Sequence, residues 1–188
     1  MKITDEIKIF VEKECRKPTS KYGYEPFDNH FKIVVSYVES LNKEFGRDQE
    51  VLIIAAWLHD IGSIIVGREN HHETGVKIAE KKLKELKYPI DKIELVKKCI
   101  LNHRGSQRRS RKNIEEKIIA DADALANFDN ISGIFKAALV YENKTQEEAR
   151  KSVLEKLERK WNQLHFEESR KIIKPRYIAV KLLLDNKR

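Results

Sequence analysis

The sequence predicts an all-α protein built as a single domain over residues 1–188. Lys, Glu, Leu and Ile are abundant, whereas the chain holds only 7 Gly and 4 Pro, a composition typical of helix-rich proteins. Apolar residues recur every three or four positions along most of the chain, which is the spacing of a helix face. A hydrophobic content of 40% with 36% charged residues suits a globular protein that buries a sizeable core. No repeat, linker or low-complexity segment divides the chain.

Three helices are expected in the first part of the chain. The first runs from about residue 4 to 17, and the second from about 28 to Gly46, a residue suited to the position after a helix. A glycine and two prolines predict a loop over residues 18–26. The third helix begins at Val51 and has no polar face, so we expect it to be buried. It is too short to cross a membrane, and we expect a loop over residues 61–70 to follow it.

The rest of the chain is expected to be helical as well. Asn70 and Glu73 have the spacing of a capping box and open a helix whose inner face carries His72 but not His71. The next helix starts near Pro89, and its apolar stripe ends at His103 on the same face. The remaining expected helices cover 115–128, 131–142, 145–164 with a second capping box at Thr145 and Glu148, and 166–186, which Pro175 divides.

Charge and cysteine usage place the protein in a broad class. The formal net charge of +8 could attract an anionic substrate, contact nucleic acid, or reflect a Lys- and Glu-rich surface. Because 30 acidic residues balance most of the 38 basic ones, a mixed solvated surface is favoured. Cys15 and Cys99 lack the spacing of a metal site, so we expect two free thiols in or near the core. The chain opens with a charged amphipathic helix rather than an apolar signal segment. We therefore expect a cytoplasmic protein with no membrane partner, of unknown oligomeric state.

The stretch Ala55-Ala56-Trp57-Leu58-His59-Asp60-Ile61-Gly62 carries the strongest functional signal. A buried apolar helix ends there in an imidazole and a carboxylate, and burying both is costly unless something pairs with them. A divalent metal ion pairs well with this combination. Because adjacent residues on a helix point about 100° apart, His59 and Asp60 can both reach one ion from the helix end.

This stretch resembles the signature of the HD-domain metal-dependent phosphohydrolases, whose ligand pattern is H…HD…D. The resemblance implies a small single-domain member with an all-α HD fold, a metal-binding core over about 25–130, and flanking N-terminal and additional C-terminal helices. It also implies the metal ligands His30, His59, Asp60 and Asp123. Asp123 stands in the apolar-Ala-Asp-x-Leu frame of the family's last ligand. Asp121 is the alternative, and the one that is not a ligand is expected to act as a supporting or capping group.

The chemistry that the resemblance implies is hydrolysis of a phosphoester or a phosphoanhydride. Mixed imidazole and carboxylate ligands suit Mn, Fe, Co, Ni or Zn better than Mg. The ion would activate a water for attack on a small phosphorylated, nucleotide-like substrate. Asp60, His72 and His103 are the expected catalytic residues, with the two histidines either holding a second ion or donating to the phosphate.

The sequence departs from one branch of the family. Many relatives, above all the two-metal signalling phosphodiesterases, carry a lysine directly after His-Asp-Ile-Gly, where this chain has Ser63. The extended GYP signature of the cyclic-dinucleotide enzymes is absent too. A small-nucleotide phosphohydrolase or pyrophosphatase is therefore the favoured reading.

The basic segment 104–112 leaves two alternatives open. It is either a solvated loop or a phosphate-binding rim beside His103, and we favour the rim, with Arg104, Arg108 and Arg109 as substrate-binding residues. Two other classes of function compete with an enzyme: a nucleotide-binding or regulatory protein that retains the metal, and a nucleic-acid-associated protein that uses this segment. The segment contains no aromatic residue on which bases would stack, which argues against the latter.

Overall fold

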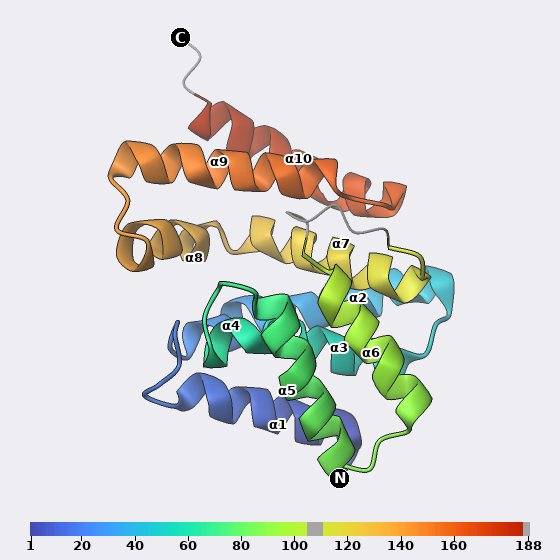
Figure 1. The fold of residues 1–188 in the computed structure, drawn as a ribbon. Helices are drawn as coiled ribbons and strands as arrows, with labels where there is room; N and C mark the ends of the chain where they lie inside the picture. The colour runs from blue at the N-terminus through green and yellow to red at the C-terminus, as the bar shows by residue number, and fades with distance from the viewer. Residues whose placement is uncertain (105–110, 186–188) are drawn as a thin grey trace.

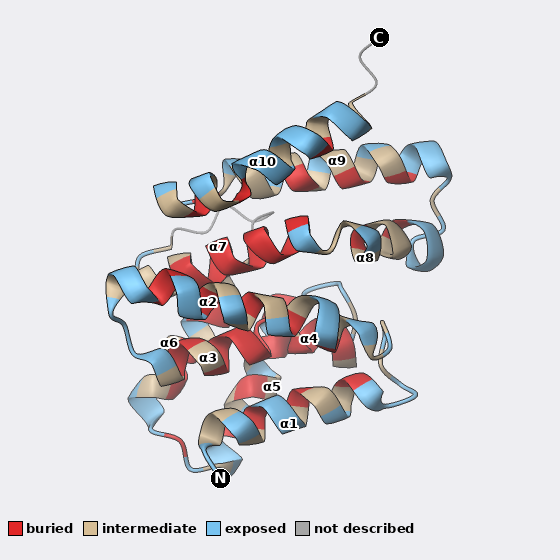
Figure 2. Cartoon of the chain, turned by 180° about the vertical axis from the view of Figure 1, so that it is seen from behind, coloured by how far each residue is buried: buried red, intermediate tan, exposed pale blue. Residues whose placement is uncertain are grey.

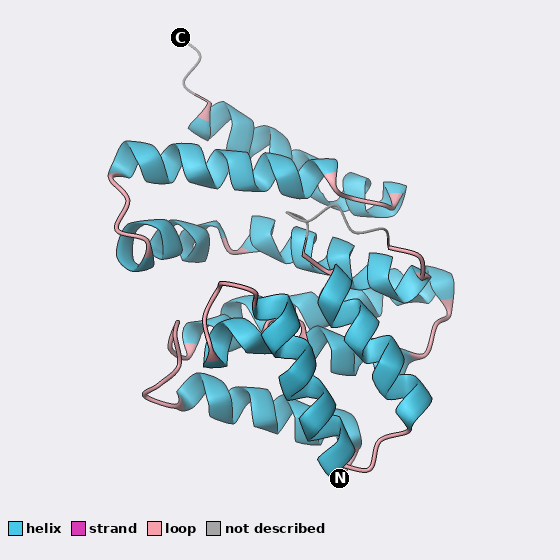
Figure 3. Cartoon of the chain, viewed as in Figure 1, coloured by secondary structure: helices cyan, strands magenta, loops and turns pink. Residues whose placement is uncertain are grey.

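A computed structural model describes residues 1–104 and 111–185 of the chain (Figure 1). All regular elements in these two ranges are helical, which confirms the all-α prediction (Figure 3). In chain order they are α1 (Ile3–Arg16), the π-helical turn η1 (Phe27–Phe31), α2 (Lys32–Phe45), α3 (Gln49–Leu58), α4 (Ile61–Ile65), α5 (His71–Glu85), α6 (Ile90–Asn102), α7 (Ile114–Asp129), α8 (Ile131–Lys136), the π-helical turn η2 (Ala137–Tyr141), α9 (Gln146–Asn162) and α10 (Glu167–Leu184).

Helix α7 is the central element of the molecule. It packs against α2, α3 and α6 on one side and against α9 and α10 on the other (Figure 1). Every residue from Ile118 to Phe128 is buried, so the helix appears red along most of its length in Figure 2. The buried hydrophobic residues form one contiguous core that extends from α1 to α10. The C-terminal helices therefore share a core with the helices that carry the histidines.

Helix α3 begins at a side-chain cap and stays buried to its end. Asp48 accepts hydrogen bonds from the backbone N–H groups of Glu50 and Val51 at 3.1 and 3.2 Å, which satisfies two of the orphan donors of the first turn. Helix α3 itself is buried at all but three of its positions. This is the buried helix that the apolar run predicts, and it delivers His59 to the interior at its C-terminal end.

Three local predictions are wrong. Residues 61–65, expected in a loop, form the short helix α4, in which Gly62 lies against the backbone of α5. Asn70 makes no side-chain cap to α5, because it adopts a left-handed conformation with φ 49°. Pro175 does not divide the last helix. It lies on the exposed face of α10, where water can bind the carbonyl that loses its partner.

Other local predictions are confirmed. The capping box at Thr145 is present: its hydroxyl accepts from the N–H of Glu148, and the Glu148 carboxylate accepts from the N–H of Thr145. Cys15 and Cys99 are free and buried, and burial raises the pKa of the Cys15 thiol to about 12. Within the described ranges, the helices are all too short or too polar to traverse a bilayer.

Candidate metal centre

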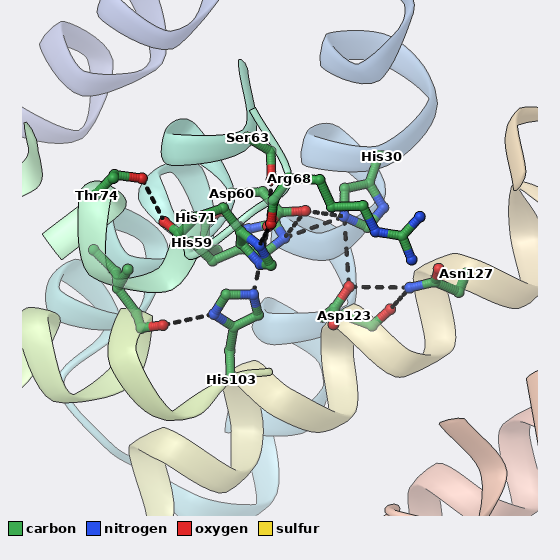
Figure 4. Close-up of polar contacts among 12 residues, drawn as sticks. His30, His59, Asp60, Ser63, Arg68, His71, Thr74, His103, Asp123 and Asn127 are labelled. Carbon is green, nitrogen blue, oxygen red and sulfur yellow. Dashed lines mark hydrogen bonds and ion pairs between the residues drawn. The ribbon is translucent and has the colours of Figure 1, made fainter. Parts of the chain in front are cut away.

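The π-helical turn η1 and the C-terminal end of α3 bring His30 and His59 together. His59 follows the last residue of α3 and is fully buried, while His30 comes from the π-helical turn η1 at the start of α2. Their Nε2 atoms lie 3.1 Å apart (Figure 4). Asp60 follows His59, and its Oδ2 lies 3.7 Å from the Nε2 atom of each histidine. These three side chains can supply three donor atoms to one ion, since the atoms all lie within 4.8 Å of one another.

The other oxygen of Asp60 faces a second pair of histidines. Oδ1 lies 3.2 Å from Nε2 of His71, at the start of α5, and 3.4 Å from Nε2 of His103, at the end of α6. These three residues form a second group that can hold a metal ion. The carboxylate of Asp60 therefore lies between two histidine pairs, and it would contribute one oxygen to each group if both held an ion.

The free ring nitrogens of three histidines all point to the same centre for one reason. The Nδ1 atoms of His59, His71 and His103 lie 2.7, 2.8 and 2.6 Å from the carbonyl oxygens of Ala56, Arg68 and Ile100. Because a carbonyl only accepts, each Nδ1 is the protonated donor, and each Nε2 keeps its lone pair. A histidine whose second nitrogen is fixed in this way is oriented as a metal ligand. The residues present therefore fit a divalent ion.

The protonation states of the histidines and of Asp60 also suit metal binding. Burial lowers the pKa of His59 to about 4 and also lowers the pKa values of His30 and His71, so these imidazoles are neutral at pH 7. Burial acts to raise the pKa of Asp60, but the facing imidazoles of His59 and His71 outweigh it and hold that pKa well below its ordinary value. Neutral imidazoles and ionised carboxylates are the forms that bind metal.

The two aspartates of α7 have different surroundings. Among the described residues, Asp123 belongs to neither three-residue group, but it is buried beside the first one, with Oδ1 3.5 Å from Nε2 of His30. Its second oxygen pairs with Lys160 of α9. Lys160 outweighs the effect of burial and lowers the pKa of Asp123. Asp121 points elsewhere and accepts hydrogen bonds at 3.0 and 3.1 Å from the backbone N–H groups of His165 and Phe166, just before α10. Two residues along a helix differ by about 200° in direction, which separates the roles of the pair.

The structure corrects the assignment of the inner face of α5. His71, which we expected to point away, is buried and faces Asp60, whereas neither metal-binding group of the described residues includes His72. His72 is buried as well, with its Nε2 3.7 Å from a carboxylate oxygen of Glu73. The apolar stripe of α5 identifies which residues are buried, but the first turn of a helix lies at the rim of the core, where a residue beside the stripe also becomes buried.

A cleft of about 550 Å³ opens over this cluster. Arg104 lines this cleft, and its role in binding substrate stays a prediction. Arg108 and Arg109 lie outside the described residues. Arg111, from the same basic segment, instead donates to the carbonyl oxygens of Asn102 and His103 at 2.8 and 3.1 Å and so caps the end of α6.

Most of the cations in the cleft were not anticipated from the sequence. Besides Arg104, the cationic lining residues are Arg68, Lys136, Lys156, Arg159 and Lys160. Three of them belong to α9, at the spacing i, i+3 and i+4, which places them on one helix face. That spacing is visible in the sequence, but a basic helix face is usually solvated, and the sequence does not show that it covers a cleft.

The family follows from the sequence match and agrees with the geometry. The HD domain family matches residues 27–127, which is more than half of the chain and includes His30, His59, Asp60 and Asp123. The chain belongs to the HD domain family. No curated protein matches the sequence significantly.

Solved structures share the fold over nearly the whole chain. A protein from Lactobacillus plantarum has a TM-score of 0.75 at 15% identity, covering 97% of this chain and 93% of that one. An HD-superfamily hydrolase from Bacillus thuringiensis has a TM-score of 0.72 at 18% identity, with coverage of 97% and 93%. Bacillus subtilis YpgQ, solved in complex with ADP, has a TM-score of 0.69 at 18% identity, with coverage of 98% and 97%. At these identities the likeness shows the fold.

Proposed function

We propose that this protein is a metal-dependent phosphohydrolase that cleaves a phosphoester or a phosphoanhydride bond of a small, nucleotide-like substrate. The observation that carries the proposal is the Asp60 carboxylate between two pairs of histidines, at the base of a cleft lined by arginine and lysine side chains. Such a site joins metal ligands to groups that bind an anion.

Two groups of residues would hold divalent ions, and the cleft would hold the substrate. His30, His59, Asp60 and Asp123 would hold one divalent ion, and Asp60, His71 and His103 would hold a second. Mn, Fe, Co, Ni or Zn suits these donors better than Mg. Bound metal supplies a water of lowered pKa and neutralises charge on the phosphate. The cations of the cleft then bind the phosphate oxygens and orient the substrate.

The cleft favours a small substrate over nucleic acid. Its volume of about 550 Å³ falls in the range of sites that enclose small molecules. Bacillus subtilis YpgQ, which shares the fold, was solved with ADP, and this supports a nucleotide as ligand. The same fact supports the alternative of a nucleotide-binding protein that retains the metal without turnover. A cytoplasmic location stays a prediction.

One experiment separates these alternatives. The purified protein is stripped with a chelator, reloaded with Mn²⁺, Co²⁺, Ni²⁺ or Mg²⁺, and incubated with nucleoside mono-, di- and triphosphates and cyclic dinucleotides. We expect hydrolysis only after metal is restored, and the products identify the bond that breaks. His59→Ala should remove bound metal and activity together. Full activity in metal-free protein would contradict the proposal, and metal binding without any turnover would favour the nucleotide-binding alternative.

A further inference from the structure

Helix α9 carries two cations that line the cleft and have no ion-pair partner among the described residues. Arg68 and Lys136 pair with Glu142 and Glu25, and Lys160 pairs with Asp123. By contrast, the side chains of Lys156 and Arg159 form no ion pair and no hydrogen bond with any part of the chain that the structure describes. Both line the same cleft as the metal centre.

Lys156 is not an ordinary solvated lysine. The pKa of Lys156 is lowered to about 8: burial is the largest cause, the positive charges of Lys160 and Arg68 act in the same direction, and the carboxylates of Asp123 and Asp60 only partly oppose them. A partly buried ammonium group without a carboxylate partner is unfavourable unless an anion joins it. The helix holds this charge beside two other cations, so the arrangement favours an anionic ligand.

The spacing along α9 gives the position of this charge relative to the metal centre. Lys160 pairs with Asp123, so Lys160 is the position of α9 that lies beside the metal centre. Lys156 precedes it by four residues, which is about 6 Å along the helix axis, and both residues lie on one face. Arg159 is three residues from Lys156 and shares that face. An anion that extends from the metal centre along α9 therefore meets Lys156 next.

We propose that Lys156 and Arg159 form a subsite for a second phosphate, which makes the cleft selective for substrates with two or more linked phosphates over monophosphates. The inference rests on the proposed function, because it takes the metal centre as the place of the first phosphate. It goes beyond that function, because these residues lie outside the part of the chain that matches the HD domain family. Lys160 is occupied by Asp123 and belongs to the metal centre rather than to this subsite.

The test uses binding, so that it does not depend on turnover. Titration calorimetry of the Mn²⁺-loaded protein measures the affinities for inorganic phosphate and for imidodiphosphate, a pyrophosphate analogue that resists hydrolysis. We expect the wild type to prefer imidodiphosphate. Lys156→Gln should weaken imidodiphosphate binding by about 10- to 100-fold, the usual effect of losing a charged hydrogen bond, and change phosphate binding less than twofold. Arg159→Gln should have a smaller effect in the same direction, about two- to fivefold, because this side chain is exposed.

Lys151→Gln is the matched control, since Lys151 lies on α9 but is exposed and does not line the cleft. It should leave both affinities unchanged. Melting temperature and metal content of each variant check that the fold and the metal centre are intact. Equal weakening of both ligands by Lys156→Gln, or no weakening of either, would overturn the subsite.

The two proposals fail in different ways. If the wild type hydrolyses nothing but its preference for imidodiphosphate depends on Lys156, then the subsite stands and the phosphohydrolase proposal fails. If the wild type hydrolyses phosphates and Lys156→Gln leaves the ratio of kcat/KM for diphosphates over monophosphates unchanged, then the subsite fails and the hydrolase stands.

Discussion

At the scale of single residues, orientation separates the two histidines at the start of α5, because both are buried but His71 is the one that faces Asp60. His30, His59 and Asp123 lie where the HD pattern implies, because a ligand pattern with fixed context identifies positions one by one. His71 was missed, since its orientation depends on a hydrogen bond from Nδ1 to the carbonyl of Arg68, outside the helix. A contact of this kind has no periodic signal in the sequence.

The first prediction separates the two aspartates of α7. Asp123→Ala should remove bound metal, because Oδ1 faces His30 in the cluster. Asp121→Ala should keep the metal and instead lower the free energy of unfolding by about 2–3 kcal/mol, because it leaves the backbone N–H groups of His165 and Phe166 without their acceptor. Elemental analysis and urea unfolding measure the two effects. The opposite order would show that the ligand had been assigned to the wrong residue.

The second prediction separates the two histidines of α5. His71→Gln should lower the metal content, because it removes one of the three donors of the second group, which are His71, His103 and Oδ1 of Asp60. His72→Gln should leave metal content unchanged and affect only stability, since the Nε2 atom of His72 lies beside the carboxylate of Glu73, whereas that of His71 faces Asp60. Metal analysis of both variants after dialysis against Mn²⁺ provides the measurement. Loss of metal from the His72 variant alone would restore the assignment made from the apolar stripe.

At the scale of helices, periodicity predicts nearly every long element, because an apolar stripe extends over several turns. The short helix α4 was not predicted: five residues are too few to show a period, and Gly62 suggested a turn. This glycine is required for packing instead. An added Cβ would lie 2.1 Å from the carbonyl oxygen of His71 and 2.7 Å from the backbone nitrogen of Gly75. The close approach of α4 to α5 fixes the first turn of α5, which carries His71.

The third prediction follows from this contact. Gly62→Ala should lower the free energy of unfolding by about 3 kcal/mol or more, because the clash is with backbone atoms that cannot move alone. Metal affinity should fall as well, since His71 moves with its backbone. Gly75→Ala is the matched control from the same interface: its Cβ would lie 3.4 Å from Cγ2 of Ile100, an ordinary contact. Thermal unfolding compares the two, and an equally stable Gly62 variant would contradict the account.

At the scale of the whole molecule, the sequence predicts helix α9 and its basic face, but it does not predict that this face lines the cleft. The stripe of α9 and its basic face are both visible in the sequence, yet only long-range packing against α7 places Lys160 at Asp123. On the other side of α7, the packing of α2, α3 and α6 accompanies the burial of His59, whose imidazole is uncharged at pH 7. The stability of the entire protein is thereby linked to the protonation of its site.

The last prediction is the pH dependence of the metal-free protein. In the folded state, burial lowers the pKa of His59 from the ordinary 6.5 to about 4, so between these values the unfolded chain binds more protons. Stability is therefore complete above pH 6.5 and is lost as the pH falls toward 4. By pH 5, His59 alone should remove about 2 kcal/mol of the free energy of unfolding, and the lowered pKa values of His30 and His71 act in the same direction.

Urea unfolding of the metal-free protein from pH 7 to pH 5 tests this prediction. His59→Asn is the control, because an amide of similar polarity does not titrate in this range, and its slope with pH should be shallower by the contribution of His59. The lowered pKa values of Asp60 and Asp123 do not interfere, because their contributions are lost only near and below the ordinary carboxylate value of 3.8. Equal slopes in the two proteins would mean that His59 is not held neutral by its burial at the end of α3.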